Sequence, residues 1–199
     1  MPVSPRRRTL LLGLLGLLGQ PGVSWAQEAP RLVEGQPFAP RVHVGGRELL
    51  LNGTGVRAVA WFKGYAAGLY LPSRTRSAEQ AVSMPGPKRL QLRMLREVPA
   101  VEFVKAFDKG VRRNTGDAEV ASLAARMAQF EALVQALGTV REGDVVDLDL
   151  DPDRGMLFSL NGTLRGEPIT GADFYAALLR SFVGVRPYDR KLKAGLLGS

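Results

Sequence analysis

The spacing of apolar residues along the chain predicts several strands, then two helices, three more strands and further helices. Between residues 41 and 94, alternating or short apolar runs predict strands in "RVHV", "RELLL", "VRAVAWF", "YAAGLYL" and "KRLQLRM". Gly45-Gly46 predicts a hairpin turn between the first two runs, and Gly64 separates the third run from the fourth.

Two helices are predicted next. Pro99 suits the first turn of a helix, because its missing N–H would be unpaired there. Residues 114–117 interrupt the helical pattern, and a second helix is predicted from about residue 118 to residue 137, before Gly138. Its apolar residues recur at spacings of three and four, which predicts a stripe that packs in the core. The stripe consists of Val120, Leu123, Met127, Phe130, Val134 and Leu137.

The segment "DVVDLDLD" alternates apolar residues with Asp147, Asp149 and Asp151. This pattern predicts a strand whose aspartates face solvent, rather than a calcium loop, because the glycine and closing glutamate of such a loop are missing. Asn161-Gly162 then predicts a hairpin.

The last helices are predicted to begin at Thr170, whose hydroxyl would cap the first turn, and within "RPYDRKLKAGLLGS". Strands and helices thus occur in segregated runs, which is typical of an α+β domain with a mostly antiparallel sheet. The 199 residues suffice for one domain with a substantial core. We expect that domain to occupy residues 41–199.

The N-terminal 26 residues have the features of a secretory signal: basic residues, an apolar run from Leu10 to Leu18 and small residues before Ala26, where we predict cleavage. Arg7-Arg8 with the leucines that follow resembles a twin-arginine signal. The apolar run is short for a membrane span, so no transmembrane segment is expected after cleavage. Residues 27–40 are rich in Pro, Glu and Gln and predict a flexible arm. We therefore expect a periplasmic or secreted protein.

Composition excludes several kinds of chemistry. The chain has no cysteine, and His43 is its single histidine, so a thiolate metal site, a His-rich metal centre and a Ser–His–Asp triad are not expected. We predict no metal and no cofactor, because the dinucleotide, phosphate-loop and nucleophile-elbow motifs are absent from the sequence. Loss of the three signal arginines lowers the formal net charge from +8 to +5. The remaining basic residues are scattered, and with export this argues against a nucleic-acid partner.

Two segments resemble the chalcone isomerase family. "LNGTGVRAVAWFKGYAAGLYLP" is similar to its first block, in which a Gly-x-Gly-x-Arg turn and strand lead into an aromatic and glycine-containing strand. "GADFYAALLRSFVGVRPYDRKLKAGLLG" is similar to the C-terminal part of the bacterial chalcone isomerase-like proteins. The resemblance covers roughly Val42 to Gly198. It implies an open-faced β-sandwich, a large antiparallel sheet with helices on one face and an apolar cleft between the two layers.

The resemblance also implies which residues bind a ligand. The family's substrate-anchoring arginine matches Arg57, and Tyr65 stands where the enzymes have a catalytic threonine. The enzymes' helical tyrosine and asparagine match Phe103 and Gly110, which have no polar side chain. An arginine with a tyrosine is instead similar to the fatty-acid-binding members. Arg57 and Tyr65 would then bind a carboxylate, while Ala60, Phe62, Ala66, Ala67 and Leu69 would belong to strands around the apolar tail.

Three functional hypotheses follow. The first is a non-catalytic domain that binds a small amphipathic anion, such as a fatty acid, in an apolar cleft. The second is an isomerase or intramolecular lyase that acts on an unsaturated carbonyl compound through Arg57 and Tyr65. The third is an envelope module that binds a protein partner, for which a cleft filled by side chains would be evidence. The oligomeric state is left open by the sequence.

Overall fold

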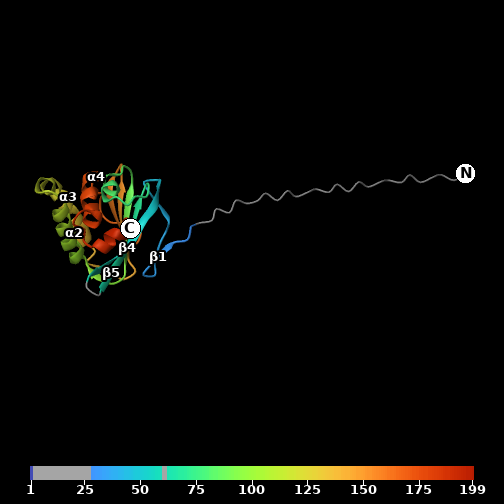
Figure 1. Cartoon of the computed structure of the whole chain (residues 1–199), viewed down its shortest axis with the longest axis horizontal. Coiled ribbons are helices and arrows are strands. Elements are labelled where there is room, and N and C mark those ends of the chain that lie inside the picture. The colour runs from blue at the N-terminus through green and yellow to red at the C-terminus, as the bar shows by residue number, and fades with distance from the viewer. Residues whose placement is uncertain (2–27, 60–61) are drawn as a thin grey trace.

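The computed structural model describes Met1, residues 28–59 and residues 62–199 (Figure 1). Apart from Met1, the predicted signal peptide lies outside the described residues, as does Ala60. Within the described part of the chain, no helix is long and apolar enough to cross a membrane.

A seven-stranded antiparallel sheet forms the centre of the molecule, with the strand order β11-β10-β9-β6-β5-β4-β3. Its strands are β3 (Arg41–Val44), β4 (Arg47–Val59), β5 (Phe62–Leu71), β6 (Lys88–Met94), β9 (Val145–Asp151), β10 (Gly155–Leu160) and β11 (Thr163–Leu164). Two small antiparallel pairs lie outside it: β1 (Arg31–Val33) with β2 (Gln36–Phe38), and β7 (Val98–Pro99) with β8 (Thr139–Val140). The helices are α1 (Ala78–Ser83), α2 (Ala100–Asn114), α3 (Asp117–Gln135), α4 (Ala172–Val183) and α5 (Arg190–Leu196).

The helices pack on one face of the sheet, and the β1–β2 hairpin lies at the other (Figure 1). The main core lies between sheet and helices and includes the predicted stripe of α3, apart from Leu137 at its edge. Its centre holds the rings of Phe107, Phe130 and Phe174, with centroids 4.6–6.1 Å apart. These edge-on and tilted contacts are the favourable geometries for aromatic pairs. The α+β prediction, with a large antiparallel sheet and helices on one face, is confirmed.

The strand boundaries differ from the prediction at one place. The run "RELLL" and the run "VRAV" belong to a single 13-residue strand, β4. Gly64, which is predicted to separate two strands, lies inside β5. No atom crowds Gly64, since a Cβ built there would lie 3.7 Å from the Arg57 carbonyl oxygen, and the sequence alone does not distinguish such a glycine inside a strand from one in a turn.

Glycines in β4 allow α5 to pack directly on the strand. A Cβ built on Gly53 would lie 2.6 Å from the Leu196 carbonyl oxygen and closer still to that of Gly195. A Cβ on Gly55 would lie 3.0 Å from Leu192. The Asn52 side chain adds a hydrogen bond, donating from Nδ2 to the Leu196 carbonyl at 2.7 Å. The first and last motifs of the sequence therefore form one packing unit.

The outer face of the sheet is covered in part by a segment that the sequence placed in a flexible arm. Residues 31–38 form the β1–β2 hairpin, and Phe38 is fully buried against Gly68 of β5. The guanidinium of Arg93 lies 5.5 Å from the centre of the Phe38 ring. The polar composition of the segment did not predict this contact, because Phe38 is the one buried residue between residues 28 and 40.

The prediction that the aspartates of β9 face solvent is wrong. Asp147, Asp149 and Asp151 are all more than nine-tenths buried. Arg89 of β6 donates two hydrogen bonds to Asp149, at 2.5 and 2.6 Å, and Gln91 donates to Asp147 at 2.8 Å. Alternation shows that the aspartates share a face, but the charge paired with Asp149 comes from the neighbouring strand, 60 residues earlier in the sequence. Asp151 instead accepts hydrogen bonds from the backbone N–H groups of Asp153 and Arg154.

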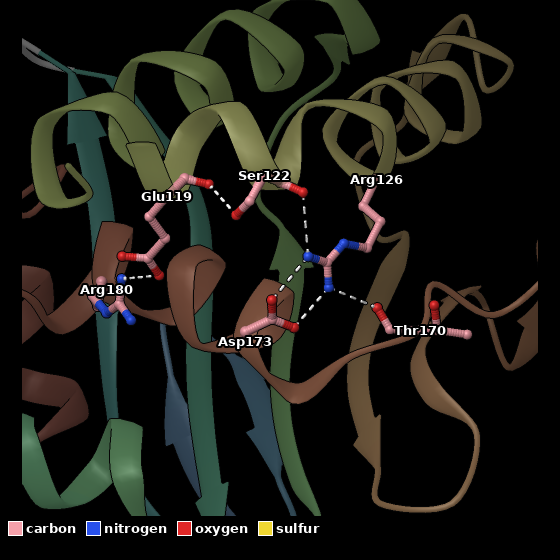
Figure 2. A network of polar contacts seen from close by, with 6 residues as sticks. All are labelled: Glu119, Ser122, Arg126, Thr170, Asp173 and Arg180. Atoms are coloured by element: carbon pink, nitrogen blue, oxygen red, sulfur yellow. Dashed lines mark hydrogen bonds and ion pairs between the residues drawn. The ribbon is translucent and has the colours of Figure 1, made fainter. Parts of the chain in front are cut away.

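The predicted cap at Thr170 is also wrong. Helix α4 begins after Gly171, which has φ +94° and provides no side-chain cap. The backbone carbonyl of Thr170 instead accepts a hydrogen bond from Arg126 of α3 at 3.2 Å (Figure 2). Arg126 also donates to both carboxylate oxygens of Asp173, at 2.6 and 2.8 Å. The start of α4 is thus fixed by an arginine on α3 rather than by its own cap.

We expect Asp173→Asn to remove a pH-dependent part of the stability. The hydrogen bonds from Arg126 lower the pKa of Asp173 below its ordinary value. The carboxylate therefore stabilises the folded state above the unfolded pKa of about 4, and this contribution is lost as the pH falls through the folded pKa. Because Asp173 is exposed, the effect at pH 7 is at most about 1 kcal/mol. Urea unfolding from pH 7 to pH 3 should show the stabilities of the wild type and the Asp173→Asn variant converging. A difference that is unchanged at pH 3 would contradict the assignment.

Candidate functional site

The register of the sheet brings Arg57 and Tyr65 together. Arg57 in β4 is directly opposite Tyr65 in β5, and Tyr65 is opposite Met94 in β6. Residues that are directly opposite in an antiparallel pair point to the same face with Cβ atoms about 5 Å apart. A register shift follows immediately after Arg57, where the pairing moves on to Ala58 and Lys63. The two residues singled out by the sequence are therefore neighbours on the face that the helices cover.

Arg57 also ties the strand to the segment before α5. Its Nη1 donates to the backbone carbonyl of Tyr188 at 2.6 Å and lies 3.8 Å from the Asp189 carboxylate. Asp189 in turn caps α5 by accepting from the backbone N–H groups of Lys191 and Leu192. The guanidinium has five N–H donors, and these contacts use only one of its nitrogens. Arg57 therefore connects β4 to the segment before α5 and still has N–H donors that can bind a ligand.

Tyr65 lies in an apolar environment next to this charge. It is 8% exposed, and its ring stacks with Phe103 of α2 at a centroid distance of 6.3 Å. Burial raises the pKa of Tyr65 far above its ordinary value, and the nearby charge of Arg57 offsets this only in part. Burial likewise raises the pKa of Tyr188. Both phenols remain protonated at any physiological pH, so the Tyr65 hydroxyl can donate to an anion, whereas the Tyr188 hydroxyl already interacts with Ser181.

A basic vestibule opens outside this pair. It has a volume of about 350 Å³ and is lined by Arg57, by Tyr65 and Tyr188, and by a row of α2 residues. The row contains Lys105, Lys109 and Arg113 at intervals of four residues, which places them along one side of the helix. Of the three basic residues in this row, only Lys105 forms an ion pair within the described part of the chain, with Glu102 at 2.8 Å. The vestibule therefore attracts anions.

An apolar cavity lies behind the vestibule, between the sheet and helices α2, α3 and α4. Its volume is about 60 Å³ and its walls are apolar except for the phenols of Tyr65 and Tyr188. Four residues line both spaces and so form the partition between them: Tyr65, Phe103, Ala106 and Tyr188. A basic vestibule next to an apolar cavity suits an amphipathic molecule, whose polar group and apolar tail need different surroundings.

Of the five small and aromatic residues expected around the apolar space, the four that the structure describes do not line the cavity. Ala67 and Leu69 belong to the core under the helices, whereas Ala66 is part of the cluster on the opposite face. Phe62 is 44% exposed and lies under the guanidinium of Arg96. Ala60 is outside the described residues. The strict alternation of side chains along a strand explains the division between neighbouring positions.

Sequence reasoning missed Tyr188 and the basic row of α2. Tyr188 lies 131 residues after Arg57, and no local pattern connects the two. Its ring occupies the space beside Gly110, where a Cβ would lie 2.6 Å from the ring carbon Cζ. Gly110 therefore makes room for Tyr188. The basic row could have been recognised from its four-residue spacing beside the apolar face of α2.

The arrangement provides hydrogen-bond donors for an anion. Arg57, Tyr65 and Tyr188 all act as hydrogen-bond donors in their prevailing protonation states. In the part of the chain that the structure describes, no group of three His, Cys, Asp or Glu side chains is placed to hold a metal ion. Phe103 and Gly110 offer no polar group from α2. Binding of an anion is the chemistry that these residues support best.

Comparisons with known proteins agree with the fold. A model of the chalcone isomerase-like family matches residues 31–198. Among solved structures, the chain is similar to a fatty-acid binding protein from Arabidopsis thaliana, with a TM-score of 0.66 and 15% sequence identity over 85% of this chain and 96% of that one. A search of curated proteins finds no match. The chain belongs to the chalcone isomerase-like family.

Proposed function

We propose that this chalcone isomerase-like protein is an exported, non-catalytic binding protein for a small amphipathic anion such as a fatty acid. The carboxylate would bind to Arg57 and Tyr65, and the apolar tail would extend past the partition towards the cavity. The observation that carries this proposal is the position of the Arg57–Tyr65 pair, at the boundary between a basic vestibule and an apolar cavity.

Electrostatics and chemistry support the choice of an anion. A guanidinium and a protonated phenol side by side are both donors, and an oxyanion is the group that accepts from both. The arginine and lysines of α2 raise the local concentration of anions at the mouth. The structural neighbour is a fatty-acid binding protein, which supports a ligand of this class. Export is proposed on the strength of the N-terminal sequence.

The size of the cavity limits how a tail can enter. At about 60 Å³, the cavity is smaller than the roughly 150 Å³ that admits a benzene ring. A long chain must therefore displace side chains, and the half-buried Phe103 in the partition is the one best placed to move. The closed form would bind short and medium chains more readily than long ones.

We expect Phe103→Ala to shift the preference towards longer chains. Removing the ring widens the passage between vestibule and cavity, so affinity for a 16-carbon acid should rise several-fold relative to a 10-carbon acid. The loss of a half-buried ring should also lower the stability by roughly 2 kcal/mol. Competition with a fluorescent fatty acid measures the chain-length series. Val101→Ala on the same helix is the matched control, since Val101 is exposed and lines neither space. If the ratio of affinities for the 16-carbon and 10-carbon acids were the same in the Phe103→Ala variant and the wild type, Phe103 would not control access to the cavity.

Native mass spectrometry of the protein purified from cells tests the proposed function directly. We expect a bound mass that denaturing extraction releases as a fatty acid. If the mass corresponded to the protein alone, and added C10 to C16 acids did not bind, the proposed fatty-acid binding would be refuted. Turnover of a chalcone that is lost in Tyr65→Phe would instead favour an intramolecular lyase, and capture of a defined envelope protein without a lipid would favour the partner-binding module.

A further inference from the structure

A second hollow lies on the far side of Arg113 from the vestibule. Its volume is about 760 Å³, and it is bounded by α1, by the junction of α2 and α3, and by the segment that joins α4 to α5. Of the residues around the hollow, Arg113 alone also lines the vestibule. We call this hollow the interhelix groove.

Four basic side chains line the interhelix groove, each from a different part of the fold. They are Arg113 at the end of α2, Arg180 near the end of α4, Arg186 in the following segment and Lys193 in α5. Glu79 of α1 is the single acidic residue that lines it among the described residues. Like charges that converge around one space repel one another, and a bound anion would relieve this repulsion.

Two of the four cations are held in place. Arg180 donates to Glu119 at 3.0 Å, and the two side chains reach toward each other between α4 and the first turn of α3 (Figure 2). Lys193 donates to the backbone carbonyl of Gly184 at 2.8 Å. Arg113 and Arg186 are exposed and form no ion pair within the described part of the chain. The groove thus combines two cations that are held by hydrogen bonds with two that form no ion pair among the described residues.

Asn114, which also lines the groove, joins the end of α2 to the segment that carries Arg186. Asn114 donates to the carbonyls of Gly110 and Arg186 at 2.9 and 2.8 Å and accepts from the N–H of Arg186 at 2.8 Å. This fixes the backbone that carries Arg186. Thr115 also lines the groove, but its hydroxyl oxygen is itself inaccessible and has no hydrogen-bond partner in the described structure, so the groups available to a ligand are the basic side chains. Helix α3 begins beside it at Gly116 without a side-chain cap.

We propose that the interhelix groove is a second anion site, which binds a phosphate ester of a small alcohol. A phosphate group presents several charged oxygens and so can engage more than one guanidinium at once. The groove is larger than a phosphate alone requires, which leaves space for the organic part of the ester. This site does not depend on the proposed carboxylate site at Arg57 and Tyr65.

Calorimetric titration with sn-glycerol 3-phosphate at low ionic strength tests the proposal. We expect saturable binding that Arg186→Gln and Arg113→Gln each weaken about tenfold, the effect of losing one hydrogen-bonded charge. Arg112→Gln is the matched control, because Arg112 is an exposed neighbour that pairs with Asp108 at 2.7 Å and does not line the groove. The control removes the same charge and should change the affinity less than twofold. Fatty-acid binding should be unchanged in Arg186→Gln, which separates this site from the vestibule.

A parallel arm identifies the source of the phosphate. Phosphatidylcholine vesicles with and without phosphatidylglycerol present the ester as a lipid headgroup. Binding to the phosphatidylglycerol vesicles alone, with the same order of variants, would assign the site to a headgroup, whereas binding of soluble glycerol phosphate would assign it to a free ester. Absence of binding in both arms, or an equal loss in Arg112→Gln and Arg186→Gln, would overturn the proposal.

Discussion

Replacing Gly53 with alanine is expected to lower the free energy of unfolding by about 3 kcal/mol, at the upper end of the usual cost of overpacking. The new methyl group would lie 2.6 Å from the Leu196 carbonyl oxygen and closer to that of Gly195. Both obstacles are backbone atoms, so no side-chain rotation can relieve the clash. Helix α5 must instead move away from β4.

The displacement would disturb buried parts of the core. Leu192 and Leu196 of α5 are fully buried, and the Asn52 side chain bonds to the Leu196 carbonyl across the same contact. Moving α5 would weaken each of these contacts. Because Asp189 at the start of α5 lies beside Arg57, we also expect weaker ligand binding in this variant.

Urea unfolding measures the effect, and Gly64→Ala is the matched control. Gly64 lies in the adjacent strand β5, and the nearest atom to a Cβ built there is the Arg57 carbonyl oxygen at 3.7 Å, an ordinary contact. This variant should be within about 1 kcal/mol of the wild type, the usual scale of a glycine-to-alanine change. Equal midpoints for the Gly53→Ala and Gly64→Ala variants would show that α5 does not depend on close approach to β4.

The contact between β4 and α5 also explains what the sequence could and could not predict. Alternation and helical periodicity located β6, β9, α2 and α3, because each of these elements repeats its apolar residues at its own period. The glycines of "NGTG" were interpreted as turn residues, although they lie in the middle of a strand. Glycine is needed at these positions because the backbone of α5 packs against them. Helix α5 lies near the end of the chain, so local sequence patterns contain no information about this contact.

The errors at the polar positions have the same physical origin. The sequence predicts that the aspartates of β9 face solvent because charged residues usually do, but in the folded sheet Arg89 and Gln91 of the neighbouring strand bind Asp149 and Asp147. Strand order decides which side chains become partners, and a single sequence does not give strand order. The same applies to the start of α4, where Arg126 of α3 replaces the expected cap.

Two residues of the candidate site were proposed by resemblance rather than by pattern. The family block identified Arg57 and Tyr65, and the register of β4 and β5 shows that they are direct neighbours. The rest of the site comes from α2 and from the segment before α5. Tyr188 became part of it only because α5 packs back on β4, which again depends on distant contacts.

The strongest test of the site compares Arg57→Gln with Tyr65→Phe on a charged ligand and a neutral one. Loss of a hydrogen bond to a charged group costs about 1.5–3 kcal/mol, so Arg57→Gln should weaken binding of decanoate roughly 10- to 150-fold. Tyr65→Phe retains the ring that stacks on Phe103 and removes only the hydroxyl, so we expect a smaller loss of about tenfold. Calorimetric titration measures both.

The neutral ligand separates binding from structure. Arg57 also bonds to the Tyr188 carbonyl and lies near Asp189, so its replacement will loosen the segment before α5 whatever its role in binding. A loosened site would weaken decanoate and its methyl ester by similar factors. A carboxylate clamp predicts a large loss for decanoate and less than a threefold change for the ester, since the ester has no charge for Arg57 to bind. Equal losses for the two ligands would reduce Arg57 to a structural tie between β4 and α5, and would leave the basic row of α2 as the source of any preference for anions.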